Sequence, residues 1–286
     1  MSIPAGLKPA DELSVLHATD KVINLMTKDG MLISLVTQPL GNGPHNIVLP
    51  LKRFERVPSF GEKALLDNNK VKLESLDVEL ENAALWSPIP EWPKVRKHGE
   101  RIKKAVPDIV AALHSDTPDQ GVLLLLEKDQ KKPDVLSGHF AQAMLEPAEI
   151  LIAGLKGMDF ENTAVGVQRL AGLGTGLTPA GDDFLSGAML ACWSGFCDQE
   201  MLVRLPGLAS QAAQRTTRLS TAYLQSAAEG EFGAVWHALL EAIAGEDNEE
   251  FRHVLNLILG IGHNSGAYTL AGFVKLVDAY AGNMQR

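Results

Sequence analysis

A glycine-rich stretch at residues 172–183, Gly-Leu-Gly-Thr-Gly-Leu-Thr-Pro-Ala-Gly-Asp-Asp, gathers the residue types in this chain best suited to bind a ligand. Its glycines alternate at 172, 174 and 176, which allows positive φ angles and a close approach of the backbone to a ligand. Thr178 is a good helix N-cap, and Pro179 fits the first helical position. The stretch therefore predicts a loop that leads into a helix, where backbone N–H groups without partners favour an anion.

The helix predicted to follow, about residues 179–196, is apolar on nearly every side. A helix with that pattern is buried, so its N-terminus lies inside the protein too. Asp182 and Asp183 fall in its first turn, where either would suit the helix dipole as a capping carboxylate. Two buried charges need partners, so one can serve the loop while the other faces a ligand or a cation. No cofactor is certain, but a carboxylate beside a phosphate site makes Mg²⁺ a candidate, although no spacing specifies a metal site.

A second junction has the same design. The sequence Gly260-Ile-Gly-His-Asn-Ser-Gly266 precedes an apolar helix predicted at about 265–282, which Asn264 or Ser265 could cap. A lone histidine is more often a structural or surface residue than a catalytic one, but His263 lies between glycines and beside a helix start. We expect the two junctions to face one common cleft, because each offers N–H groups that an anion would satisfy.

A third polar stretch, Arg215-Thr-Thr-Arg-Leu-Ser-Thr221, lies within a helix predicted at about 199–229. Arg215 and Arg218 are three residues apart and would share a helix face. Arginine is suited to bidentate binding of carboxylate or phosphate. The alternative is a polar helix face paired with neighbouring acids.

These three segments supply the candidate site. The candidate catalytic residues are Asp182, Asp183 and His263. The candidate substrate- or phosphate-binding residues are Gly174, Thr175, Gly176, Thr178, Arg215, Arg218, Asn264, Ser265 and Gly266.

The elements that must position these residues change in type along the chain. Up to about residue 90, short apolar runs predict strands at 22–26, 31–36, 46–49, 70–76 and 83–86. Asp29-Gly30 between the first two runs is a tight hairpin turn signal. We therefore expect a small antiparallel sheet or a partly closed barrel.

Prolines 88, 90 and 93 predict a boundary, with a β-rich region at 1–92 and an α-helical domain at 93–286. The remaining helices are predicted at about 95–115, 137–157, 161–172, 232–245 and 248–259. The fold class expected is α+β with segregated elements.

Composition narrows the class of protein. The 286 residues are 45% hydrophobic and 21% charged, which allows a buried core, and the net charge of −9 disfavours nucleic acid and anionic membranes as partners. A basic run at 94–104 predicts a solvated helix face or a docking site for an acidic partner. Cys192 and Cys197 lack zinc-site spacing. Without a signal peptide pattern or an apolar run of the ~20 residues that a membrane helix needs, the chain is expected to be cytoplasmic.

The stretch from Gly172 to Gly187, Gly-Leu-Gly-Thr-Gly-Leu-Thr-Pro-Ala-Gly-Asp-Asp-Phe-Leu-Ser-Gly, resembles the signature of the AllH family. The 215–220 and 262–266 stretches and the N-terminal Gly-Pro-His-Asn-Ile-Val at 43–48 are similar to other parts of that family. The resemblance spans most of the chain. Two residues depart from the family pattern: Thr175 replaces a usual proline, and Asn264 replaces a small hydroxyl residue. These departures leave the substrate identity open.

The resemblance implies a subunit of oxamate carbamoyltransferase, which converts oxalurate and phosphate to oxamate and carbamoyl phosphate in purine (allantoin) nitrogen catabolism. It also implies an FdrA-like subunit and a further subunit as partners. Two alternatives stay open. One is a non-catalytic structural or regulatory subunit, and the other is a metal-dependent hydrolase that uses Asp182 and Asp183.

Overall fold

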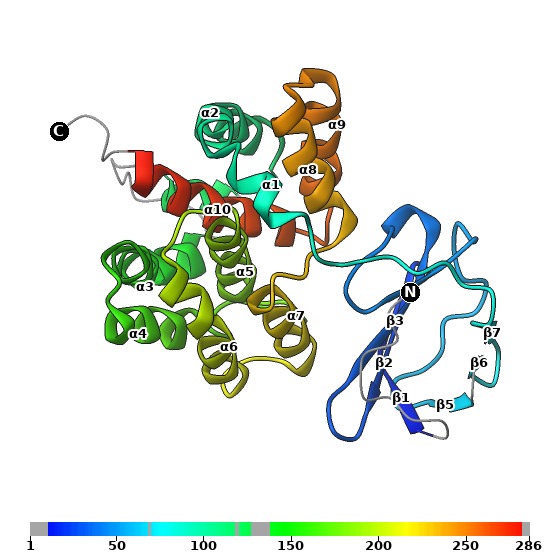
Figure 1. The fold of residues 1–286 in the computed structure, drawn as a ribbon. Helices are drawn as coiled ribbons and strands as arrows, with labels where there is room; N and C mark the ends of the chain where they lie inside the picture. Colours follow the sequence, from blue (N-terminus) through cyan, green and yellow to red (C-terminus); the bar gives the residue numbers. More distant parts are fainter. Residues whose placement is uncertain (1–10, 68–69, 118–119, 127–137, 282–286) are drawn as a thin grey trace. The chain divides into compact units, whose positions relative to one another are not determined.

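The computed structural model describes residues 11–67, 70–117, 120–126 and 138–281 (Figure 1). The chain forms two compact units, Met1–Pro88 and Ile89–Arg286. The first unit is a curled β-sheet and the second is helical, so the α+β prediction is confirmed.

The sheet of the first unit contains seven strands in the order β4-β3-β2-β1-β5-β6-β7. The strands are β1 (Asp11–Ala18), β2 (Val22–Thr27), β3 (Leu32–Thr37), β4 (Asn46–Leu49), β5 (Lys63–Asp67), β6 (Lys70–Lys72) and β7 (Asp77–Glu79). The predicted hairpin joins β2 to β3, and Gly30 adopts the positive φ of 98° that its tight turn requires. Alternate residues of the strands, such as Leu13, Leu25 and Leu35, form one buried core.

Several details of this sheet differ from the prediction. The pair β3–β4 is parallel, because the chain crosses over between these strands through the short 3₁₀ helix η1 (Gln38–Leu40) and the loop that follows it. The strands β1, β5 and β7 were not predicted, and the strand predicted at 70–76 ends at Lys72. Residues 83–86, predicted as a strand, are irregular.

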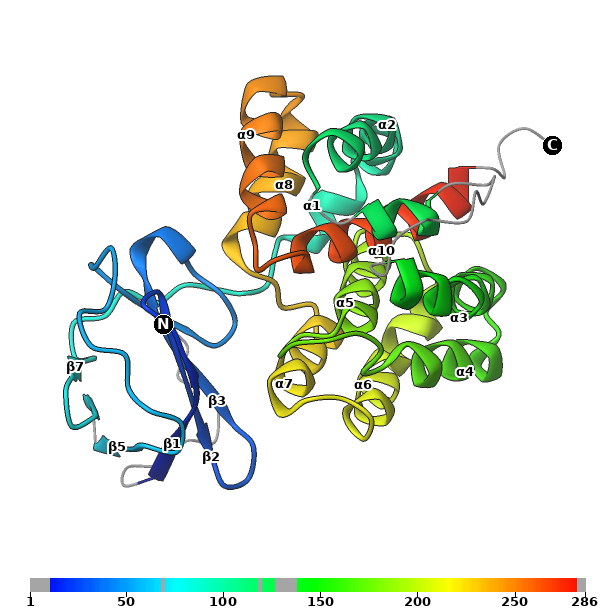
Figure 2. The same cartoon turned by 180° about the vertical axis from the view of Figure 1, so that it is seen from behind.

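The second unit is built from helices (Figures 1 and 2). They are α1 (Trp92–Arg96), α2 (Gly99–Asp116), the 3₁₀ helix η2 (Gln120–Leu125), α3 (Gly138–Gly157), α4 (Phe160–Leu170), α5 (Ala180–Trp193), α6 (Gln199–Ala213), α7 (Arg218–Ala228), α8 (Ala234–Gly245), α9 (Asn248–Leu259) and α10 (Ser265–Ala281). At its centre lies α10, which packs against α5, α2, α3 and α9. Among the described residues, no helix is long and apolar enough to cross a membrane.

The helix predicted at 199–229 is in fact two helices, α6 and α7, with residues 214–217 between them. Thr217 has an extended backbone, and its hydroxyl accepts a hydrogen bond from the Ser220 amide at 3.0 Å. A threonine in this role begins a new helix. The single-helix prediction is wrong because this N-cap was not recognised.

The helices α5 and α10 pack backbone against backbone. A Cβ atom at Gly187 of α5 would overlap the carbonyl oxygen of Thr269, and one at Gly272 of α10 would overlap the carbonyl oxygen of Phe184. Glycine on each helix therefore lets the other helix approach closely. As predicted, α5 is buried along nearly its whole length.

We expect Gly187→Ala to lower the free energy of unfolding by at least about 1–3 kcal/mol, the usual cost of overpacking a core. Gly207→Ala in α6 is the matched control, since its added methyl meets no atom within 4 Å. The control should gain about 0.5–1 kcal/mol, because alanine loses less backbone entropy than glycine in a helix. Urea denaturation measures both, and equal stabilities for the two variants would contradict the close packing.

Candidate functional site

The glycine-rich loop enters α5 as predicted, but its first turn is capped differently. The N-cap position is Pro179 rather than Thr178, and no side chain caps it. The Gly181 amide donates to the Leu173 carbonyl at 2.8 Å, and the Asp182 amide donates to the Pro179 carbonyl at 2.9 Å. The prediction that Thr178 caps the helix is wrong, because Pro179 holds the N-cap position and its carbonyl accepts from the amides of Asp182 and Asp183.

Backbone amides at the exposed tip of the loop, unlike those of the first turn of α5, lack protein acceptors in the part of the chain that the structure describes. Thr175, Gly176 and Leu177 are exposed, and Gly176 has a φ of 91° with open space around it. Within the described residues, no protein acceptor is bonded to the amides of Thr175 and Gly176. An anion at this junction would therefore meet the loop amides rather than those inside α5.

Asp182 is a structural anchor for the loop. It is 2% exposed, and its carboxylate accepts a hydrogen bond from the Gly172 amide at 2.9 Å and another from the Thr216 hydroxyl. Burial raises the pKa of Asp182 above its ordinary value, while hydrogen bonds from Thr216, Gly172 and Ser220 oppose that rise. Its oxygens thus join the loop to the start of α7.

Gly172 completes this anchor. Its φ is 74°, and a Cβ atom there would overlap the carbonyl oxygen of Arg215. Only glycine therefore allows the loop to lie against the α6–α7 connection while its amide reaches Asp182.

Asp183 has a different environment, although it is the next residue. It is 9% exposed, and its carboxyl group is hydrogen bonded to the side chain of Ser265. Its Oδ2 atom is buried and has no hydrogen-bond partner. Burial raises the pKa of Asp183 well above its ordinary value; the Ser265 hydrogen bond opposes that rise and the charge of Asp182 adds to it. Asp183 therefore keeps an acceptor without a protein partner, whereas both carboxylate oxygens of Asp182 accept from the protein.

Ser265, the first residue of α10, joins the two glycine-rich junctions. Its Oγ lies 2.9 Å from the Thr178 Oγ1, and its side chain also bonds Asp183. The two junctions therefore lie side by side, as expected, and the common cleft stays a prediction. His263 is exposed in the turn before α10, and Asn264 is half-buried.

The polar stretch at 215–218 meets the same loop. The Thr217 hydroxyl donates to the Leu177 carbonyl at 2.5 Å. Arg215 lies in the α6–α7 connection and Arg218 is the first residue of α7, so the prediction that they share a helix face is wrong. Both side chains are exposed, and the break at Thr217 puts them beside a helix start instead.

The N-termini of α5, α7 and α10 thus gather around one loop. The positive ends of three helix dipoles create a field that attracts anions. The first turns of α7 and α10 contain no acidic residue, and the two acids of α5 are buried below the loop. This arrangement would favour a small anion at the exposed tip of the loop.

The structure brings together residues from all three predicted segments, and it adds Gly172, Thr216, Thr217 and Ser220, which were not among the predicted site residues. The signal that could have found the three hydroxyl residues is their run in the 215–221 stretch, since threonine and serine favour helix starts. The ligand-binding roles of Thr175, Asn264 and Gly266 stay predictions.

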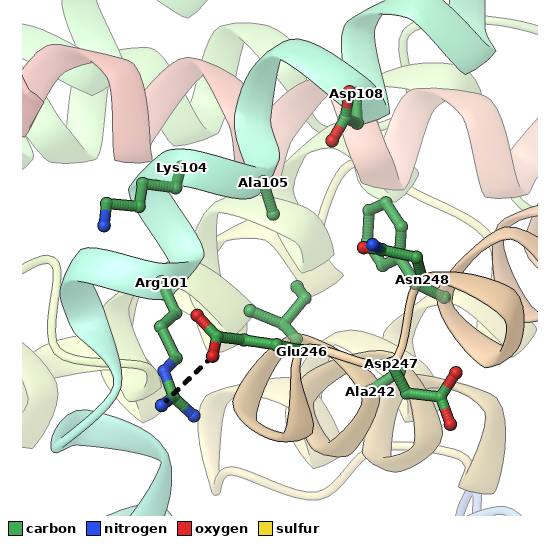
Figure 3. A pocket seen from close by; sticks show the side chains of 10 residues that line it. Arg101, Lys104, Ala105, Asp108, Ala242, Glu246, Asp247 and Asn248 are labelled. Atoms are coloured by element: carbon green, nitrogen blue, oxygen red, sulfur yellow. Dashed lines mark ion pairs between the residues drawn. The ribbon is translucent and has the colours of Figure 1, made fainter.

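A hollow of about 370 Å³ lies elsewhere in the helical unit, between α2 and the α8–α9 pair (Figure 3). Arg101 and Glu246 form an ion pair of 3.4 Å at its wall, and Phe251 lines it. Arg101 and Lys104 of the basic run also line it, and Lys103 pairs with Glu100 at 2.8 Å. None of its lining residues belongs to the three segments of the loop site.

The described residues contain no group of three or more His, Cys, Asp or Glu side chains placed to hold a metal ion.

Two family models match the chain. One, described as oxamate carbamoyltransferase subunit AllH, matches residues 170–277, and the other, described as the AllH family N-terminal domain, matches residues 18–85. The first match contains all three segments of the loop site. No solved structure matches the chain.

The raised pKa of Asp183 makes stability depend on pH in a defined direction. The folded state binds a proton that the unfolded state releases, so stability is lost as pH rises from the ordinary pKa of 3.8 towards the higher pKa of the folded state. Asp183→Asn removes this titration, so it should stabilise the protein at pH 7, by up to about 1.4 kcal/mol for each pH unit crossed. Its advantage should shrink as pH falls towards 4.

Urea denaturation between pH 4.5 and pH 8 measures this difference. Asp159→Asn is the matched control, because Asp159 is an exposed N-cap of α4 and asparagine caps equally well. If Asp183→Asn is less stable than wild type by the same amount at every pH, the prediction is wrong, and the protein stabilises the charged form of Asp183.

Proposed function

The chain belongs to the AllH family, and on that premise we propose that it is the anion-binding subunit of an oxamate carbamoyltransferase. The proposed reaction converts oxalurate and phosphate to oxamate and carbamoyl phosphate. The proposed setting is the cytoplasm, in nitrogen catabolism from purines such as allantoin. The proposed partners are an FdrA-like subunit and a further subunit.

One observation carries the proposal: the Thr178–Ser265 hydrogen bond of 2.9 Å, which joins two glycine-rich helix junctions 87 residues apart in the chain. Neither junction alone is a specific anion site. Joined, and with the start of α7 bonded to the same loop through Thr217, they form a surface where three helix dipoles add. The substrates of the proposed reaction are all anions.

The residues divide by the group that each would hold. The amides of Gly174, Thr175 and Gly176 would bind the phosphate, assisted by the Thr178 hydroxyl. Arg215 or Arg218 would hold the carboxylate of oxalurate, for which the guanidinium has the right shape. Asn264, Ser265 and Gly266 would contact the ligand from the start of α10.

The chemical step needs one proton transfer. A phosphate oxygen attacks the carbamoyl carbon, the bond from that carbon to the oxamate nitrogen breaks, and the leaving nitrogen takes up a proton. Monohydrogen phosphate loses one proton in the same step, so the reaction balances. His263 or Asp183 would transfer it, since both stand at the loop site. Asp182 would act by anchoring the loop, because its oxygens already accept from the protein.

A competing function has support from the same loop. The internal hydrogen bonds of Gly181 and Asp182 and the tight contact at Gly172 are also those of a packing junction. A non-catalytic subunit could use the motif in that way, with the chemistry in a partner. Anion binding distinguishes the two functions, because a packing junction has no preference among anions.

We expect phosphate to raise the melting temperature of the isolated chain above that in chloride at the same ionic strength. At ten times the Kd, binding to the native state adds about 1.4 kcal/mol, or roughly 3–6 °C for a protein of this size. Gly176→Val should abolish the phosphate-specific rise, because the side chain would fill the space above the loop.

Gly61→Val is the matched control for this experiment. Gly61 also has a positive φ, 79°, and open space around it, but it lies in the β-rich unit. Both variants should be strained by about 1–2 kcal/mol, yet only Gly61→Val should keep the response to phosphate. Identical melting in all anions would favour the non-catalytic function.

In the reconstituted assembly, Arg215→Ala should lower kcat/KM for oxalurate about 10- to 100-fold, as expected for loss of a charged hydrogen bond of about 1.5–3 kcal/mol. Arg252→Ala on the exposed face of α9 is the control and should leave the rate unchanged. Phosphorolysis of oxalurate is followed by the formation of carbamoyl phosphate. An unchanged kcat/KM for Arg215→Ala would remove this arginine from the site.

A further inference from the structure

Asp183 keeps an unsatisfied acceptor in the first turn of α5, close to the starts of α7 and α10. Its Oδ2 atom is buried without a hydrogen-bond partner, although the Ser265 side chain lies close enough to the carboxyl group to lower its pKa. The residue is 9% exposed, so bulk water has little access to it. A buried acceptor without a donor costs free energy, and such an atom in a native protein calls for an explanation.

The surroundings favour a neutral donor over a cation. The positive ends of α5, α7 and α10 meet here, and that field opposes a metal ion while it attracts anions. An N–H group that is part of an anionic ligand satisfies both conditions. Its charged end meets the loop amides, and its N–H meets Asp183.

The ligands of the proposed function differ in this respect. Oxalurate, oxamate and carbamoyl phosphate each join an anionic group to an amide or carbamoyl N–H, whereas inorganic phosphate has none. A site made of helix N-termini alone would not distinguish the NH₂ of these molecules from a methyl group. A buried carboxyl oxygen would, because an analogue without the N–H leaves that oxygen unpaired.

We propose that Asp183 is the specificity-determining residue of the loop site, and that its Oδ2 accepts a hydrogen bond from the amide or carbamoyl N–H of the ligand. The proposal rests on the proposed function for the identity of the ligands. Ser265 would position Asp183 through its interaction with the carboxyl group, and Thr178 would position Ser265 through the bond between their hydroxyl groups.

Two pairs of nearly isosteric ligands test this directly. Oxamate and pyruvate differ by NH₂ against CH₃, as do carbamoyl phosphate and acetyl phosphate. Titration calorimetry and thermal melting of the intact chain give Kd for each. Wild type should bind the NH₂ member of each pair about 10- to 100-fold more tightly, the usual value of a hydrogen bond to a charged or buried group.

Asp183→Asn should remove this preference. The asparagine amide has one oxygen and one NH₂ group where the carboxyl group had two oxygens, so the site loses an acceptor and gains a donor. Asp183→Leu, which offers neither donor nor acceptor, is the second variant and should also bind both members equally. The control Asp159→Asn should keep the wild-type preference.

The outcomes separate the two proposals. Equal binding of oxamate and pyruvate by wild type, with a phosphate-specific rise in melting temperature, would overturn the role of Asp183 and leave the anion site standing. A preference that persists in both Asp183 variants would overturn it too. No binding of any anion by the chain or the assembly would overturn the proposed function, and the role of Asp183 with it. If ligands bind only when Mg²⁺ is present, the partner of Asp183 is a cation rather than a ligand N–H, and the inference is overturned.

Discussion

The backbone contact between α5 and α10 determines the rest of the helical unit. Gly187 and Gly272 let each helix touch a carbonyl of the other. The same register brings Ser265, at the start of α10, beside Asp183, at the start of α5. A larger residue at either glycine would push the helices apart and separate that pair. The close contact between α5 and α10 therefore fixes both the packing of the core and the geometry of the loop site.

Local patterns in the sequence predicted the features that depend on neighbouring residues. The Asp29-Gly30 turn, the alternating strands beside it and the apolar α5 all follow from short-range chemistry. The strand β1 was not predicted because a bulge between Val15 and His17 breaks the alternation of apolar and polar residues by which strands are recognised. The break between α6 and α7 at Thr217 was not predicted because apolar residues continue at helical spacing on both sides of it.

Long-range contacts explain what the sequence could not reveal at the site. Thr178 and Pro179 have the typical pattern of an N-cap and first helical residue, yet Thr178 bonds Ser265, 87 residues later. The different environments of Asp182 and Asp183 have the same origin. Their partners, Thr216 and Ser265, come from two separate segments. The three polar segments could be found in sequence, but tertiary contacts decide which aspartate anchors the loop and which one keeps an oxygen without a partner.

The long sequence separation of these contacts also affects how the protein forms. Contacts between distant residues require large loops to close, and they form late in folding. During synthesis, α5 leaves the ribosome well before Gly272, the residue on which its close packing depends. Until α10 is made, the nearly all-apolar surface of α5 lacks its partner helix and is open to aggregation. The nascent chain therefore cannot assemble the loop site until α10 has been made, because Ser265 belongs to that helix.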